Sequence, residues 1–217
     1  MSQTDSFIEE VTEEVRRDRL FRLMRKYGWI AVLVVLLVVG GAAWNEWRKA
    51  EAEARAQATG DAIIAAMQAD APDARVDALA TVETHTPGAQ AVVDMLRAAE
   101  LAQDGQAGEA AELLDRVATD GALPDIYRDL AGFKATLLAD ALPAEERRLR
   151  LEALVASGSP LRLQAQEQLA LMDIEAGARD AAIERLQKIM DDSEVTPGLQ
   201  RRASRLMLAL GADSRAG

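Results

Sequence analysis

The chain has 217 residues, 49% of them hydrophobic, and is therefore able to bury a sizeable core. It contains no cysteine, which excludes disulfides, thiol nucleophiles and thiolate metal sites. The first 43 residues hold six basic and six acidic side chains, so the net charge of −11 belongs to the residues after them. The acidic charge of that later part disfavours nucleic-acid binding. Aromatic residues make up only 4%, while alanine and leucine are abundant, so we predict an all-α protein.

Residues 1–26 are predicted to form an amphipathic leader helix. Ser6 and Glu9 have the spacing of a capping box. The apolar positions recur at helical spacing between glutamates: Ile8, Val11 and Val15. Such a stripe could dock on a cytosolic or membrane partner, and a frayed helix whose basic end only sets the topology is the alternative.

A single transmembrane helix is predicted over residues 27–45. This stretch contains no charged side chain, and its length just spans the roughly 30 Å of bilayer hydrocarbon. Aromatic side chains, which prefer the two headgroup regions, lie near both of its ends: Tyr27, Trp29, Trp44 and Trp47. The spacing of these anchors therefore matches a membrane span better than a buried core helix.

The flanking charges predict the orientation of this helix. Basic residues crowd its N-terminal side: Arg16, Arg17, Arg19, Arg22, Arg25 and Lys26. The positive-inside rule then places the N-terminus in the cytoplasm and exports residues 46–217, which in a bacterium means an inner-membrane protein with a periplasmic domain. A cleaved signal peptide is the alternative, since Gly41-Ala42-Ala43 offers small residues for cleavage, but the long leader with its acidic residues is unlike a short positive n-region.

The exported part contains a hidden repeat. Four prolines are separated by 37, 36 and 37 residues: Pro87, Pro124, Pro160 and Pro197. Such a period indicates stacked structural units. Serine or threonine precedes three of these prolines, so we expect each proline to begin a helix after a capping hydroxyl.

Apolar residues at fixed distances from the prolines are the predicted core of each unit: Leu96, Leu101, Phe133, Leu138, Leu169, Ile174 and Leu206. Gly105 and Gly177 lie two periods apart between helical stretches, where a tight turn needs positive φ. The same offset pairs Ala98 with Ala170, Ala110 with Ala182, Leu114 with Leu186 and Val117 with Ile189. We therefore predict an opening helix pair (about 45–70 and 74–82), three helical hairpins and a closing helix, stacked as a right-handed α-solenoid.

Known catalytic patterns are missing from the sequence. His85, the only histidine, has no second metal ligand at a recognisable spacing. The sequence has no phosphate-binding glycine loop, no GxSxG motif and no HExxH motif. We expect no enzymatic activity, no cofactor, no metal and no small-molecule substrate.

The segments from Gly105 to Pro124 and from Gly177 to Pro197 resemble tetratricopeptide repeat (TPR) units whose period exceeds the one usual for that repeat. The whole plan is more specific: a leader over Asp5 to Lys26, then Tyr27-Gly28-Trp29, one membrane helix and alanine-rich hairpins. This plan resembles the YfgM-like family of ancillary subunits of the bacterial SecYEG translocon.

The family resemblance implies a non-catalytic scaffold in the inner membrane. Its partners would be the Sec translocon and a membrane-anchored periplasmic chaperone, and its role would be to assist newly exported proteins. An anchor followed by such repeats also occurs in assembly factors for cytochrome c maturation or other cell-envelope complexes, which is the alternative function.

Overall fold

The computed structural model describes the backbone of residues 3–212 and the side chains of residues 24–30 and 32–212. Within this range the chain is helical without any strand, which confirms the predicted all-α class. The helices are α1 (Gln3–Ala66), α2 (Pro72–Ala80), α3 (Pro87–Gln103), α4 (Ala107–Thr119), α5 (Asp125–Thr136), α6 (Ala144–Ala156), α7 (Arg162–Glu175), α8 (Arg179–Asp191) and α9 (Pro197–Ala209). The chain divides into two units, Met1–Gln57 and Ala58–Gly217.

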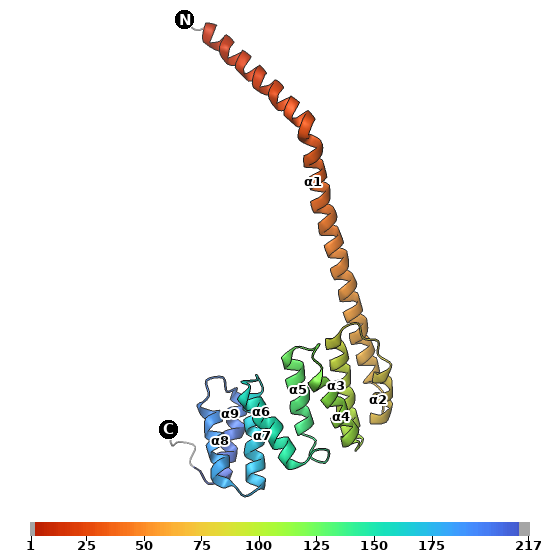
Figure 1. The fold of residues 1–217 in the computed structure, drawn as a ribbon, viewed down its shortest axis with the longest axis vertical. Coiled ribbons are helices and arrows are strands. Elements are labelled where there is room, and N and C mark those ends of the chain that lie inside the picture. The colour runs from red at the N-terminus through yellow and green to blue at the C-terminus, as the bar shows by residue number, and fades with distance from the viewer. Residues whose placement is uncertain (1–2, 213–217) are drawn as a thin grey trace. The chain divides into compact units, whose positions relative to one another are not determined.

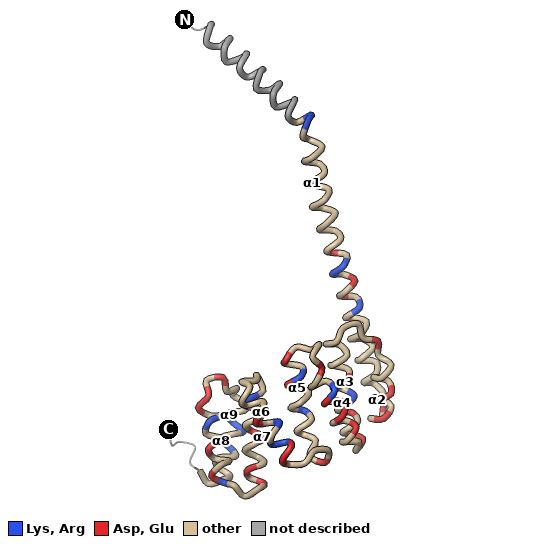
Figure 2. The backbone as a smooth tube through the Cα atoms, viewed as in Figure 1, with Lys and Arg blue, Asp and Glu red and all other residues tan. Residues whose placement is uncertain are grey.

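The first unit is formed by α1. This helix contains a stretch that is long and apolar enough to cross a membrane. The charge-free stretch between Lys26 and Glu46 stands out in Figure 2. Valine and leucine side chains along it are exposed, as are the four predicted aromatic anchors: Tyr27, Trp29, Trp44 and Trp47. The rings of Trp44 and Trp47 lie 5.2 Å apart, and the Lys26 ammonium lies 5.6 Å from the centre of the Tyr27 ring.

Several predictions for the leader lie outside the described side chains. Its backbone is helical from Gln3 onwards, so the helix begins before Ser6 and the prediction that Ser6 and Glu9 cap its start is wrong. The proposed apolar stripe and four of the six topology-determining residues belong to this part: Arg16, Arg17, Arg19 and Arg22. Arg25 and Lys26, directly before the apolar stretch, are exposed.

The second unit stacks helices in chain order (Figure 1). The end of α1 and α2 form the opening pair, followed by the hairpins α3–α4, α5–α6 and α7–α8 and by the closing helix α9. The first helix of the opening pair ends at Ala66, earlier than the predicted residue 70, and α2 begins at Pro72, two residues earlier than predicted. A proline is suited to this first position because its missing N–H would have no helical partner there.

Two of the four repeated prolines begin a helix as predicted. Pro87 is the first residue of α3 and Pro197 the first residue of α9. The preceding threonines are the caps: Thr86 Oγ1 accepts a hydrogen bond from the amide of Ala89 at 3.1 Å, and Thr196 Oγ1 accepts one from the amide of Leu199 at 3.3 Å. These caps satisfy amides that have no partner inside the helix.

The prediction is wrong for Pro160 and inexact for Pro124. Pro124 has extended backbone angles and is the N-cap residue of α5. Pro160 lies in a turn, and α7 begins two residues later, at Arg162. The reason is Ser159, whose hydroxyl donates to Oδ2 of Asp129 in the preceding hairpin at 2.6 Å and accepts from the amide of Leu161 at 3.2 Å. Its oxygen therefore caps a tight turn instead of the helix.

Glycine ends helices in the turns of the first and third hairpins. Gly105 has φ 79° and Gly177 has φ 74°. Each is the left-handed residue of a Schellman motif, in which the following amide, of Gln106 or Ala178, reaches the carbonyl five residues back at 2.8 Å. The same motif, which we did not predict, ends α6 at Gly158 and α9 at Gly211.

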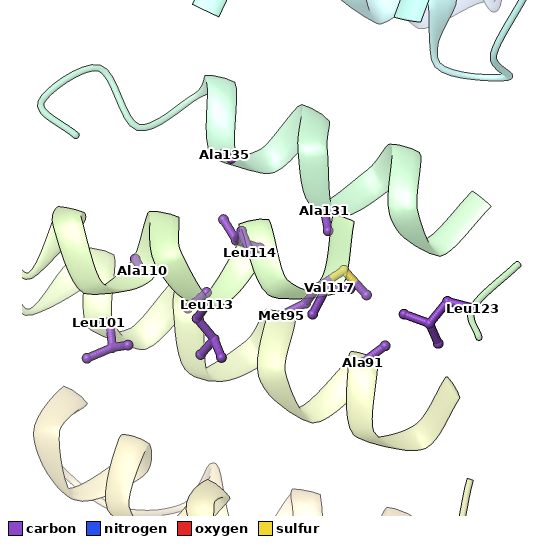
Figure 3. Packing of buried hydrophobic residues seen from close by; sticks show 11 residues of the cluster. Ala91, Met95, Leu101, Ala110, Leu113, Leu114, Val117, Leu123, Ala131 and Ala135 are labelled. Atoms are coloured by element: carbon purple, nitrogen blue, oxygen red, sulfur yellow. The ribbon is translucent and has the colours of Figure 1, made fainter. Parts of the chain in front are cut away.

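Alanines allow the hairpin helices to approach closely. Figure 3 shows α3, α4 and α5 meeting through Ala91, Ala110, Ala131 and Ala135, with larger side chains such as Leu114 between them. Every residue of the pairs that lie two periods apart is buried: Ala98 and Ala170, Ala110 and Ala182, Leu114 and Leu186, Val117 and Ile189. The first and third hairpins therefore repeat the same packing.

The predicted core residues are buried to different degrees. Leu101 and Leu169 are buried. The others are partly buried: Leu96, Phe133, Leu138, Ile174 and Leu206. Leu138 lies in the turn after α5, where it still packs against the core of the first two hairpins. Ile174 lies in α7 directly after Asp173, and Asp173 is buried.

Buried ion pairs join successive units. Arg75 of α2 donates to the buried Glu100 of α3 at 2.7 Å, and Arg148 of α6 donates to the buried Asp173 of α7 at 2.8 Å. Both pairs span 25 residues along the chain. Arg185 of α8 binds the second oxygen of Asp173, also at 2.8 Å. The pairs of Arg75 and Arg148 tie one helix to the first helix of the next hairpin, and the pair of Arg185 joins the two helices of the third hairpin.

We predict that Gly105→Ala and Gly177→Ala each lower the free energy of unfolding by about 1 kcal/mol, because alanine is strained at positive φ. Urea unfolding of the full chain followed by circular dichroism measures this. Gly108→Ala is the matched control, since Gly108 lies in α4 with no atom within 4 Å of an added Cβ. This change should leave stability equal or slightly higher. Equal losses in all three variants would contradict the assignment.

We predict that stability falls in acid partly through Asp173. Burial raises the pKa of this carboxyl, but hydrogen bonds from Arg148 and Arg185 outweigh it, so the folded pKa lies below the ordinary value. The ionised group therefore stabilises the fold at neutral pH, and this contribution is lost as the pH falls through about 4 towards the folded pKa. Asp173→Asn should cost about 2 kcal/mol at pH 7 and less at pH 3. The exposed control Asp140→Asn should change neither value.

Candidate functional site

An open groove with a volume of about 1030 Å³ lies between α4, α5 and α6. Its lining includes small and apolar residues: Ala118, Gly132, Ala153, Leu154 and Pro160. Its walls are polar and carry both signs of charge: Glu112, Asp115, Arg116, Asp125, Arg128, Asp129 and Arg150. A groove of this size and openness suits an extended peptide segment better than a small ligand, which is usually enclosed.

The helix α6, which lines the groove, differs from the equivalent helices α4 and α8. In those helices the position that faces the first helix of the hairpin is Ala110 or Ala182, each with 0% exposure. In α6, the buried residues Leu151 and Leu154 correspond to Leu114 and Val117 of α4. The same register places Arg147 at the position of the alanine. An arginine needs far more space than an alanine, so α6 cannot approach α5 as closely.

Arg147 also explains how the middle hairpin manages without a glycine turn. Its Nε donates a hydrogen bond to the carbonyl of Thr136, the last residue of α5, at 2.8 Å. Carbonyls at a helix C-terminus have no helical partner and carry partial negative charge, which a guanidinium satisfies. The side chain that separates α5 from α6 thus also caps α5.

Arg150 bridges the groove from α6 to α4. Its guanidinium donates to both carboxylate oxygens of Asp115, one of them at 3.1 Å, and to Glu146 at 2.6 Å. The hydrogen bond to Asp115 is the largest cause of a raised pKa of Arg150, and burial opposes it. Two parallel N–H···O bonds fix the orientation of the arginine plane, which holds the two walls in register.

Other wall residues satisfy one another. Arg128 forms an ion pair with Asp125 on α5. Asp129 accepts the hydrogen bond of Ser159, which is buried. Glu112 and Arg116 on α4 are exposed, and no ion pair to either is described within residues 24–212. They are the charges of the groove that remain available to a bound segment.

Of the predicted residues, only Pro160 lines this groove, and the predicted membrane anchors belong to the other unit. His85 is exposed and lines a separate groove beside α2. Sequence reasoning missed Arg147 and Arg150. The available signal was the register of the repeat, which places these arginines where α4 has Ala110 and Leu113.

Comparisons with protein-family models, with curated proteins and with solved structures found no match.

We predict that Arg150→Ala loosens the groove. The loss of the bidentate bond to Asp115 should lower the free energy of unfolding by about 1 kcal/mol, since the pair is partly exposed. Hydrogen exchange at the amides of α6 should accelerate more than exchange in α3. Arg116→Ala is the matched control in the same groove, and faster exchange of α6 in that variant would contradict the bridging role of Arg150.

Proposed function

We propose that this protein is a non-catalytic scaffold, held in a membrane by α1, that binds protein segments in the groove between α4, α5 and α6. In this proposal the N-terminus lies in the cytoplasm and the hairpin unit is exported, which in a bacterium places it in the periplasm. The observation that carries the proposal is the combination of one apolar helix with a repeated helical unit that contains an open groove.

The exposure of the apolar helix supports the anchor. None of its most apolar 18-residue window is buried inside the protein. Soluble proteins rarely leave so large an apolar surface in water. Trp29 on one side and Trp44 on the other fit the two headgroup regions. Arg25 and Lys26 directly before the span support a cytoplasmic N-terminus by the positive-inside rule.

The repeated packing supports a TPR-like solenoid. The first and third hairpins share their buried alanines and their glycine turns. Solenoids of this kind bind extended segments on surfaces formed by several units. We propose that the hairpins continue in a right-handed sense, as in tetratricopeptide proteins.

The chemistry of the groove supports binding over catalysis. Most of its charged groups are engaged with one another, which holds the walls in place. Within the described residues, no group of three or more histidines or carboxylates could hold a metal ion. The free charges, Glu112 and Arg116, would select a bound segment by electrostatics and not by chemical conversion.

The partners follow from the resemblance of the whole plan to the YfgM-like family. We propose that the anchor associates laterally with the Sec translocon, while the hairpins meet a membrane-anchored chaperone or a newly exported protein. The small residues Gly40 and Gly41 in the apolar helix have no atom within 4 Å of an added Cβ, so a neighbouring helix can approach the backbone there.

Site-specific photocrosslinking in native membranes tests this function. A photoreactive residue at Val35 should capture a subunit of the translocation channel, and one at Thr119, in the groove, should capture an exported protein or a chaperone. The control position is Gln103, which is exposed at the end of α3 outside the groove. Replacement of residues 27–45 by an unrelated apolar helix should abolish capture at Val35.

Two results would contradict the proposal. Capture of the same proteins from Thr119 and from Gln103 would show that the groove is not the binding surface. Capture at Val35 that contains no channel subunit would remove the translocon from the proposal and leave only a membrane-anchored binding protein.

A further inference from the structure

The last helix of the stack, α9, has an outward face that no described part of the chain covers. Arg201 and Arg205 lie one turn apart on this face and are exposed, and Leu208 next to them is 59% exposed. A shallow pocket of about 470 Å³ lies beside the two arginines and reaches Met190 of α8. The face therefore combines an apolar side chain with two charges.

The repeat shows that the equivalent face of α3 is covered. Pro197 of α9 corresponds to Pro87 of α3, and this register places Arg201, Arg205 and Leu208 where α3 has Ala91, Met95 and Ala98. Those three residues of α3 are buried in the core that it shares with α4 and α5. In α7 every side chain is at least partly buried except that of the last residue, Glu175. The outward face of α9 is thus the position at which a next helix packs in this architecture.

The two charged side chains of this face are exposed and can bind a partner. Residues 197–212 contain three arginines and no carboxylate. Arg202 is engaged with the buried Glu167 at 2.6 Å, whereas no ion pair of Arg201 or Arg205 is described within residues 24–212. The unit has a large excess of carboxylates. Two neighbouring arginines that are not paired with a carboxylate are therefore available to bind an acidic surface.

The opposite end of the stack offers such a surface. A groove of about 610 Å³ lies between the end of α1 and α2, and its lining is mostly small: Ala58, Ala62, Ala65, Ala66, Ala78 and Thr81. Glu83 lines the same groove, and the exposed carboxylates Asp61 and Asp77 stand one helical turn from Ala65 and Thr81. The only basic residue in 58–84 is Arg75, which is bound to Glu100.

We propose that these two ends bind each other between copies of the chain, so that α9 of one copy packs on the α1–α2 groove of the next. Leu208 would enter the alanine-lined groove, and Arg201 and Arg205 would pair with Asp61, Asp77 and Glu83. The contact continues the packing of the repeat, since it supplies α9 with the neighbour that α3 and α7 have within the chain. Figure 2 shows the acidic residues along α2 at one end of the stack and basic residues on α9 at the other.

The geometry of this interface has a consequence for assembly. The two surfaces differ, so the contact is heterologous and leaves a free end on each copy, which produces a series of oligomers. The affinity in solution should be modest because the ion pairs are exposed, but confinement to one membrane raises the effective concentration.

Charge reversal in the full chain tests the proposal. In detergent at low salt, sedimentation should show self-association of the wild-type chain. Arg201→Glu with Arg205→Glu, or Asp61→Lys with Asp77→Lys, should each weaken it by about tenfold or more, because like charges then face each other. A mixture of the two variants should associate again, since the reversed surfaces complement each other. Asp104→Lys with Glu109→Lys, exposed residues outside both surfaces, is the matched control.

Disulfide trapping gives an independent readout, because the chain has no native cysteine. The double variant Ala62→Cys with Leu208→Cys should form a ladder of crosslinked species on oxidation in native membranes, and a mixture of the two single variants should form only dimers. Crosslinking of the Leu208→Cys variant alone would indicate a symmetric contact and overturn the proposal. So would a wild-type chain that stays monomeric in sedimentation, or a mixture of charge variants that fails to associate.

Discussion

The close approach of neighbouring helices through buried alanines is the constraint on which the second unit depends. Ala110 and Ala182 occupy the same place in two hairpins and are fully buried, as are Ala98 and Ala170 on the facing helices. A helix can approach another this closely only where both present small side chains. The larger residues beside them, such as Leu114, then fill the space between the backbones. Because each helix leaves one face for the next, the stack is stable only as a series.

Both candidate binding surfaces arise where this constraint is relaxed. Arg147 takes the place of a packing alanine between α5 and α6 and binds the carbonyl of Thr136, and the groove lies between these helices and α4. At the end of the stack, Arg201 and Arg205 occupy positions that are buried in α3, so α9 keeps a face without a neighbour. In each case arginine replaces a small or apolar residue, because its long charged side chain prevents tight packing and can bind carbonyls or carboxylates.

Arginine–carboxylate pairs give the stack its register. Arg75 with Glu100 and Arg148 with Asp173 join successive units, and Arg150 with Asp115 spans the groove. Buried pairs of this kind add little net stability compared with apolar contacts, but removal of one partner leaves a buried charge and is costly. They therefore select one alignment of the hairpins. The apolar stretch, residues 27–45, contains no charged residue, and its exposed valines and leucines suit lipid.

The sequence by itself determined the helical class, the apolar segment and the order of the helices, because these depend on local patterns. The proline period marked the beginnings of α3 and α9, and Gly105 and Gly177 marked turns that need positive φ. Only the tertiary structure showed that Pro160 lies in a turn, since Ser159 is engaged by Asp129 thirty residues away. Only the tertiary structure showed the groove, because Asp115 and Arg150, which meet across it, are 35 residues apart in the chain. Their contact depends on how far α6 stands from α5, and that distance is set by side-chain volumes across two helices and not by any local pattern.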